Sequence, residues 1–388
     1  MFHRTELPSH LQDFHDVSNT PAFTKTSLQR NLSTCVPKHN IMFLKTHKCA
    51  SSTLQNIFMR FGDTHNLTFV LPPHGNYMGH PAKFTSNLTI SLPSVFAKEY
   101  NIFCHHTRWD ETEIVKIMPS DTVFISALKQ PSTMFVSLYD YFGLNKRYKT
   151  SLEGFLQTPK RFYNHHGDKI FARNPMSFDF GLEKEDFDNQ TANDLKIAEI
   201  DRRFSLIVLV EFMDESLILL RKILCWKWED VIAFKVNARR REYKKTLTDD
   251  LRRKIEEWNS ADAQLYKFFR KKLQNQISDY GSQQMQHDTK KLKRLTNLWY
   301  DLCVDKQITK NETSDSRFQV WHPSVSGFQL SQWGMKNSTC VQLATAENPY
   351  TDYLRIKLWP SYQTTTTHVP VTTASKLFQD DWQLPGFW

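Results

Sequence analysis

Long apolar runs are missing from the chain. None of its 388 residues falls in a run of about 18 consecutive apolar positions, the length that a transmembrane helix requires. The best apolar segment, 206–220, is interrupted by Glu211, Asp214 and Glu215. The opening residues, MFHRTELPSHLQDFHD, lack the apolar region of a signal peptide. These absences alone favour a cytosolic protein without a membrane span.

Glycine and cysteine are also scarce. Eleven glycines exclude a collagen-like or Gly/Ser-rich chain. Six cysteines are too few and too widely spaced for a disulfide scaffold, and no metal-ligand spacing occurs, so we expect no metal site. In an oxidising lumen one to three disulfides are plausible, with Cys303 and Cys340 as the favoured pair; otherwise the cysteines are buried thiols. The net charge of +9 suits an anionic ligand and is too diluted for a nucleic-acid-binding coat.

Glycosylation sequons point to a different compartment from the missing signal peptide. N-x-[ST] occurs at six positions, and chance accounts for only a few in a chain of this length. The six asparagines are Asn31, Asn66, Asn87, Asn189, Asn311 and Asn337. Their number favours the lumen of the secretory pathway over the cytosol.

Strands and helices alternate along the chain. Apolar runs predict strands at 39–44, 66–72, 100–106, 121–129 and 204–212. Helical spacing predicts helices at 54–61, 111–119, 130–142 and 215–226 and a basic helical region at 239–275. Gly62 is expected just past the end of the first helix. This alternation predicts an α/β protein with a mostly parallel central sheet and helices on both faces.

Three regions are distinguished by composition. Residues 1–38 read as a polar N-terminal arm or stem, 39–357 as the folded domain, and 358–388 as a Thr-rich, poorly ordered tail. Within the domain, 276–320 is polar and shows few core signals.

The segment after the first predicted strand has the character of a phosphate site. It reads KTHKCASST at 45–53 and opens a helix, whose N-terminal N–H groups and dipole favour an anion. Lys45 and Lys48 add positive charge, and hydroxyl donors follow. The loop contains no glycine, so it is not the GxxxxGK[ST] loop of kinases and ATPases. Alternatively, it is an ordinary surface connection that happens to carry Lys and Ser.

Several segments together resemble the galactose-3-O-sulfotransferase family of Golgi carbohydrate sulfotransferases. The loop KTHKCASSTLQNI is similar to the family's 5′-phosphosulfate-binding loop. Further similarity lies in HHTRW (105–109), MPSDTVFISALKQP (118–131), SLIVLVEFMDESLILLRKILCW (205–226) and FKVNAR (234–239). The resemblance covers roughly 38–357. It implies a P-loop-like sulfotransferase fold and transfer of a sulfuryl group from 3′-phosphoadenosine 5′-phosphosulfate (PAPS) to the 3-hydroxyl of a terminal galactose on a glycolipid or glycoprotein glycan.

The resemblance assigns donor-binding roles to the loop. Lys48 aligns with the family lysine that reaches the bridging oxygen of the donor, where charge grows during transfer. Lys45 is the rival for this role. The 5′-phosphate is expected to lie against the small and hydroxyl residues Ala50, Ser51, Ser52 and Thr53 and the local backbone N–H groups.

Two further donor contacts are expected outside the loop. In the family an Arg and a Ser clamp the 3′-phosphate, at the positions of Lys129 and Ser137. Lysine keeps the charge but loses the two-pronged contact of arginine. Arg239, Arg240 and Arg241 are candidates for a second contact, although a charge run is more often a solvated face.

A histidine is expected to be the general base. His106 lies at the carboxyl end of the third predicted strand, where ligand sites of α/β proteins form, and imidazole accepts protons near neutral pH. Strand alternation sends the adjacent His105 to the opposite face, so only one of the two should enter the site.

The acceptor side is expected around LPPHGNYMGHP at 71–81. His74 and His80 are candidates to hydrogen-bond sugar hydroxyls, and Tyr77 or Trp109 to stack on a sugar or on adenine. His105 is a further substrate-binding candidate. The family implies a Golgi lumenal protein anchored as type II, although this chain shows no span, and it implies no metal.

Other functions remain open at this stage. A long basic cleft would favour a glycosaminoglycan acceptor, with a uronic acid or hexosamine, whereas a neutral aromatic pocket would favour galactose. Lys129 in place of arginine raises a catalytically silent glycan-binding paralogue as a further alternative. A kinase is opposed by the missing glycines.

Overall fold

The structure is a computed structural model, and it describes residues 35–92, 99–165, 171–234, 247–320 and 325–359. The predicted N-terminal arm and Thr-rich tail therefore lie almost entirely outside the described residues. So do Asn31 and the three arginines at 239–241.

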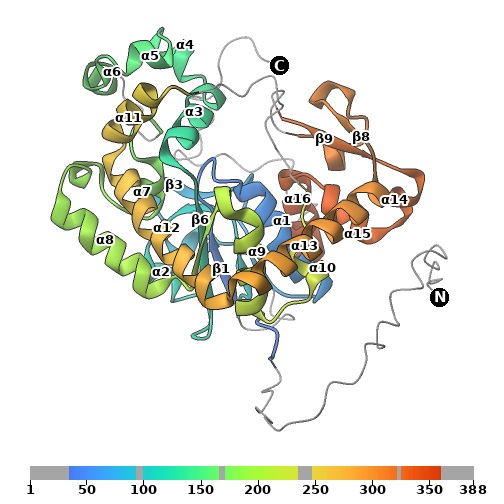
Figure 1. The fold of residues 1–388 in the computed structure, drawn as a ribbon. Helices are drawn as coiled ribbons and strands as arrows, with labels where there is room; N and C mark the ends of the chain where they lie inside the picture. The colour runs from blue at the N-terminus through green and yellow to red at the C-terminus, as the bar shows by residue number, and fades with distance from the viewer. Residues whose placement is uncertain (1–34, 93–98, 166–170, 235–246, 321–324, 360–388) are drawn as a thin grey trace. The chain divides into compact units, whose positions relative to one another are not determined.

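A five-stranded parallel sheet forms the centre of the fold (Figure 1). Its strand order is β2-β4-β1-β6-β7. The strands are β1 (Ile41–Leu44), β2 (Phe69–Val70), β4 (Ile102–Phe103), β6 (Val123–Leu128) and β7 (Leu206–Leu209). Every residue of β1 is completely buried, because this strand is flanked by β4 and β6 and covered by helices. The predicted α/β class with a mostly parallel sheet is confirmed.

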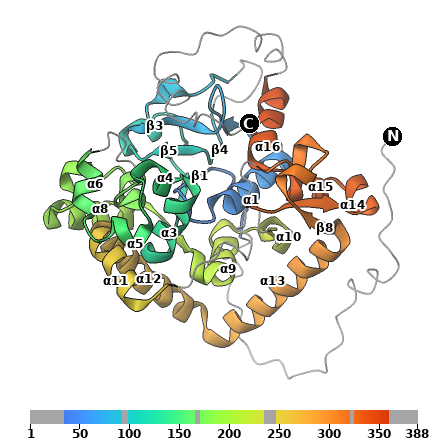
Figure 2. The same cartoon turned by 90° about the horizontal axis from the view of Figure 1, so that it is seen from above.

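Helices supply the connections and the covering layers. In the first half of the chain they are α1 (Ser51–Thr64), α2 (Glu111–Ile114), α3 (Pro131–Tyr141), α4 (Leu144–Tyr148), α5 (Leu152–Phe155), α6 (Pro159–His165), α7 (Pro175–Asp179) and α8 (Gln190–Arg203). In the second half they are α9 (Met213–Leu224), α10 (Trp228–Val231), α11 (Asp249–Trp258), α12 (Ser260–Tyr280), α13 (Ser282–Cys303), α14 (Gln332–Lys336), α15 (Ser338–Ala344) and α16 (Glu347–Leu358). The C-terminal α16 lies beside α1, as both views show (Figures 1 and 2).

The predicted strand at 100–106 is two separate strands. β4 ends at Phe103, and β5 (His106–Arg108) pairs in parallel with β3 (Tyr77–Lys83) in a second, two-stranded sheet. This pairing places Tyr77 directly opposite His106. The sequence pattern missed the break because no turn residue separates Phe103 from His106, so the run looks continuous.

Two other details differ from the prediction. Gly62 lies inside α1, not beyond its end, and a Cβ there would come within 2.4 Å of the Phe69 ring. Its role is therefore close packing of α1 on β2. The region 276–320 also contributes more than expected, since it includes the end of α12, all of α13 and β8 (Val304–Ile308).

The C-terminal part is fastened by a disulfide. Cys303, at the end of α13, is bonded to Cys340 in α15, as the sequence suggested for a luminal chain. Next to it, β8 pairs with β9 (Gly327–Leu330) in an antiparallel hairpin. Cys49 and Cys104 are buried free thiols. Among the described residues, no helix combines the length and apolar character needed to cross a bilayer.

Candidate active site

The loop between β1 and α1 has an unusual backbone. Lys48 and Ala50 both adopt positive φ, 58° and 52°, and Ala50 is the N-cap of α1. Non-glycine residues in this left-handed region cost roughly 1–3 kcal/mol each, and such strain gathers at functional sites. Turns of this kind direct successive N–H groups into a concavity that binds anions. The loop thus has phosphate-loop character without glycine.

Lys45 is the most deeply buried charged group of the loop, with only 1% of its surface exposed. Its Nζ lies 2.7 Å from Nε2 of His106 and donates to Oε1 of Glu347 at 2.9 Å. The other carboxylate oxygen of Glu347 accepts a hydrogen bond from Ser52. A single carboxylate from α16 therefore bridges two residues of the predicted donor loop.

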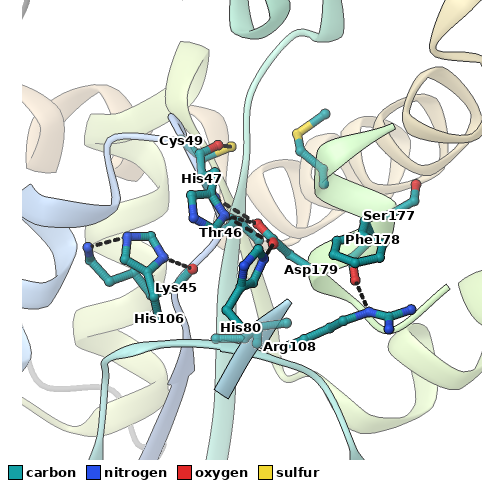
Figure 3. A network of polar contacts seen from close by, with 12 residues as sticks. Lys45, Thr46, His47, Cys49, His80, His106, Arg108, Ser177, Phe178 and Asp179 are labelled. Carbon is teal, nitrogen blue, oxygen red and sulfur yellow. Dashed lines mark hydrogen bonds and ion pairs between the residues drawn. The ribbon is translucent and has the colours of Figure 1, made fainter. Parts of the chain in front are cut away.

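His47 is held by a buried carboxylate from α7 (Figure 3). Asp179 accepts from the His47 backbone N–H at 2.8 Å and lies 2.9 and 3.0 Å from its Nδ1. It also lies 3.1 Å from Nε2 of His80. The remaining nitrogen of His47, Nε2, is 3.2 Å from the hydroxyl of Tyr77. This arrangement fixes the orientation of the His47 ring, as a carboxylate does for a catalytic histidine.

Aromatic rings gather around these histidines. His106 stacks on His47 with ring centroids 4.3 Å apart and on Tyr77 at 4.8 Å. Tyr77 is 43% exposed, so this cluster reaches the surface through its ring. Lys48 extends to α3, where its Nζ lies 3.4 Å from the centre of the Tyr141 ring, a cation–π contact.

Burial and neighbouring charges set the protonation states. Burial, reinforced by Lys45, His47 and His80, lowers the pKa of His106 well below its usual 6.5, so its ring is neutral at physiological pH. Burial also lowers the pKa of Lys45, and Glu347 opposes that effect. Burial would raise the pKa of Asp179, but His47 and His80 outweigh it and hold the pKa at about 2, so the carboxylate is ionised.

The predicted 3′-phosphate residues lie on the elements that flank the loop. Lys129 directly follows β6, and its charge acts on the thiol of Cys49 within the loop. Ser137 is half-buried in α3, one helical turn before Tyr141. Residues four apart share a helix face, so Ser137 is on the side of α3 that contacts Lys48.

The acceptor candidates divide into two groups. His74 and Tyr77 are exposed, and Tyr77 contacts the histidine cluster. His105 and Trp109 are buried: His105 bonds to Thr351 of α16 at 3.0 Å, and Trp109 donates to Glu199 at 2.7 Å. Neither of these two rings has the open surface that stacking or hydrogen bonding to a sugar requires. His105 and His106 have different partners, Thr351 for His105 and Lys45 for His106. Only His106 belongs to a strand, so the expected alternation along one strand does not apply to this pair.

Three residues of the site were not anticipated. His47 lies between the two loop lysines, and its position in KTHK was a signal that sequence analysis could have used. Asp179 and Glu347 come from segments 132 and 302 positions along the chain from their loop partners, and no local pattern marks them. Only the fold brings these carboxylates to the loop.

Among the residues that the structure describes, one group of side chains could hold a metal ion. His47, His80 and Asp179 offer ligand atoms that all lie within 4.8 Å of one another. Two histidines and a carboxylate are a set that zinc accepts. The hydrogen bonds from His47 and His80 to Asp179 account for the geometry without an ion, so the expectation of metal-free chemistry stays a prediction.

Comparison with known proteins identifies the same family that the loop motif resembles. The galactose-3-O-sulfotransferase family model matches residues 3–358, nearly the whole chain. The chain belongs to this family, and the protein is therefore a sulfotransferase.

Individual proteins similar to this chain are also members of this family. Galactosylceramide sulfotransferase of Bos taurus is 33% identical over 349 residues, covering 86% of this chain and 82% of the relative. The Homo sapiens galactosylceramide sulfotransferase is 33% identical over 340 residues, covering 84% and 80%. Galactose-3-O-sulfotransferase 2 of Homo sapiens is 34% identical over 330 residues, covering 81% and 82%. The family resemblance inferred from the sequence is confirmed.

Proposed function

We propose that the protein transfers a sulfuryl group from PAPS to the 3-hydroxyl of a terminal galactose on a glycolipid or glycoprotein glycan. The observation that carries the proposal is the loop at 45–53: a turn with two positive-φ residues and two lysines, opening α1, directly beside a cluster of buried histidines. The names of the relatives, which refer to galactose and galactosylceramide, support the acceptor.

The donor is held by the loop and by the start of α1. Lys48 neutralises the oxygen that bridges phosphorus and sulfur, where negative charge increases as the bond breaks. The hydroxyls of Ser51, Ser52 and Thr53, with the backbone N–H groups after Ala50, hold the 5′-phosphate. Lys129 and Ser137 hold the 3′-phosphate from β6 and α3.

The transfer step requires a group that accepts the proton of the sugar hydroxyl. The galactose oxygen forms a bond to sulfur, the bond from sulfur to the bridging oxygen breaks, and adenosine 3′,5′-bisphosphate leaves. His106 is one candidate base, but both of its ring nitrogens contact Lys45, so Lys45 must move first. His47 is the other, already oriented by Asp179 with Nε2 directed at Tyr77 on the exposed rim.

We propose a Golgi lumenal location. Support comes from the disulfide between Cys303 and Cys340 and from four sequon asparagines, Asn66, Asn87, Asn189 and Asn311, whose side chains are exposed. Protein made in a secretory host should lose mass on treatment with an N-glycosidase. No change in mass would contradict the luminal location.

The reaction is tested by incubating the purified chain with radiolabelled PAPS and a panel of glycans, followed by linkage analysis of the product. We expect label on O3 of terminal galactose. In the same assay Lys48→Ala should give no labelled product, whereas Lys116→Ala, altered at an exposed surface ion pair, should give as much as the wild type.

Other outcomes identify the alternatives. Label on a uronic acid or hexosamine would replace galactose by a glycosaminoglycan acceptor. Binding of adenosine 3′,5′-bisphosphate and glycan without any transfer would indicate a catalytically silent paralogue. Absence of both donor binding and transfer would refute the proposal.

A further inference from the structure

Glu347 is an acid in the middle of a site that should attract a strongly anionic donor. It is the first residue of α16, and only 15% of its side chain is exposed. One carboxylate oxygen accepts from Nζ of Lys45 at 2.9 Å, and the other accepts from Oγ of Ser52. Its charge also contributes to raising the pKa of Tyr77 and Tyr141, after the larger effect of burial. The carboxylate therefore lies among the groups that surround the loop.

The contacts of this carboxylate are those that a donor oxyanion would make. An ammonium at 2.9 Å and a hydroxyl on the first turn of a helix are typical partners of a phosphate or sulfate oxygen. Both partners belong to the segment that the proposed function assigns to the donor.

We propose that the Glu347 carboxylate occupies an anion subsite, formed by Lys45 and Ser52, that a sulfuryl or phosphate oxygen of the donor takes over on binding. The inference rests on the proposed function and adds to it a residue that competes with the donor. Glu347 keeps the buried Lys45 paired with a negative charge until the donor supplies one.

The displaced carboxylate has a second place to go. Glu347 opens a helix of 12 residues, and an acidic side chain in the first turn is stabilised by the helix dipole and by N–H groups that lack intrahelical partners. A rotation of the Glu347 side chain about χ1 would therefore replace its contact with Lys45 by contacts with the N-terminal N–H groups of α16. Carboxylate and donor cannot share the subsite, since two like charges about 4 Å apart repel by roughly 1–4 kcal/mol.

The test is isothermal titration calorimetry of the full chain with adenosine 3′,5′-bisphosphate and with PAPS. Glu347→Gln keeps the shape of the side chain and removes its charge. We expect its Kd for one or both nucleotides to be at least about tenfold lower than that of the wild type. If the subsite takes the sulfuryl oxygen, only the Kd for PAPS falls; if it takes the phosphate oxygen, both fall.

A matched control comes from the same helix. Lys357→Gln breaks the ion pair between Lys357 and Asp63, which also joins α16 to α1 but lies away from the loop. Its Kd values should equal those of the wild type. Should Glu347→Gln fail to fold, Glu347→Asp shortens the reach by one methylene and should tighten binding to a smaller degree.

The outcomes separate this inference from the proposed function. The subsite is refuted and the function stands if the wild type binds nucleotide and transfers sulfate, while Glu347→Gln binds both nucleotides no more tightly than the wild type does. If the wild type neither binds nor transfers, the proposed function fails and the subsite fails with it.

Discussion

Lys45 contacts both ring nitrogens of His106. Its Nζ is 2.7 Å from Nε2, and its backbone carbonyl accepts from Nδ1 at 2.9 Å. A carbonyl can only accept, so Nδ1 carries the proton and Nε2 presents its lone pair to the ammonium. The histidine predicted to be the base is therefore in the right tautomer to accept a proton, and Lys45 occupies the position from which the proton would come.

Substitution of the two stacked histidines distinguishes the candidate bases. His47→Gln and His106→Gln should be compared with His287→Gln, a histidine exposed on α13. Loss of the base should lower kcat by about 10²–10⁴-fold and leave the Kd for adenosine 3′,5′-bisphosphate nearly unchanged. Because His47 is already oriented by Asp179, we expect the larger loss of kcat in His47→Gln. A larger loss in His106→Gln would assign the base to His106.

Removal of Lys48 should stop catalysis. Lys48→Ala removes the ammonium proposed to neutralise the leaving phosphate oxygen, and we expect kcat to fall by at least about 10²-fold. Lys48→Arg keeps the charge and should recover part of the rate. The measurement is single-turnover transfer from radiolabelled PAPS at saturating donor. Wild-type rates in Lys48→Ala would refute the assigned role.

Lys129→Arg should strengthen donor binding. A guanidinium makes two parallel hydrogen bonds to a phosphate where an ammonium provides a point charge, so we expect the Kd for adenosine 3′,5′-bisphosphate to fall about three- to tenfold. Calorimetry with adenosine 5′-phosphate, which lacks the 3′-phosphate, is the matched control and should show no gain. An unchanged Kd for the bisphosphate would place Lys129 outside the 3′-phosphate site.

The protein should lose stability as the pH falls from 7 to 5. Burial lowers the folded-state pKa of His80, His105 and His106 below 6.5, so below that pH the unfolded chain binds protons that the folded protein excludes. Each histidine then lowers the free energy of unfolding by up to about 1.4 kcal/mol per pH unit. Urea unfolding at pH 7 and pH 5.5 measures the effect.

Asp262 acts in the opposite direction and provides a control. Burial raises its pKa to about 7, so the stability it contributes is present at low pH and is lost as the pH rises from 3.8 through 7. One carboxyl opposes three histidines, and the net effect remains a loss on acidification. Asp262→Asn should make the fall steeper. Equal stability at both pH values would contradict the prediction.

The sequence predicted the parts of the fold that depend on local pattern. The buried strands of the central sheet, the loop and the start of α3 at Pro131 were all located correctly, because apolar runs and helix signals are local. The break between β4 and β5 was missed because no turn residue lies between Phe103 and His106. Gly62 was misread as a helix end because packing against Phe69 leaves no signal in sequence spacing.

Sequence motifs directed attention to the loop and to His106, but they missed His47 and the two carboxylates that distant helices bring to the loop. The motif at 45–53 directed attention to Lys45 and Lys48. Asp179 and Glu347 could not be found in the same way, since acids are common on helices and nothing nearby distinguishes these two. Their importance comes from burial beside the loop, which is a property of tertiary structure.

α16 lies beside α1 and contributes side chains to the candidate site. It supplies Glu347 to Lys45, Thr351 to His105, and Arg355 to the carbonyl of Pro72 in the segment that leads into β3. A shortened product that stops before residue 347 would retain all five strands of the central sheet, yet it would leave the buried Lys45 ammonium without its carboxylate and the buried His105 ring without Thr351. Splice variants, nonsense alleles and expression boundaries that remove this helix should therefore disable the enzyme even though the sulfate-donor motif itself is intact.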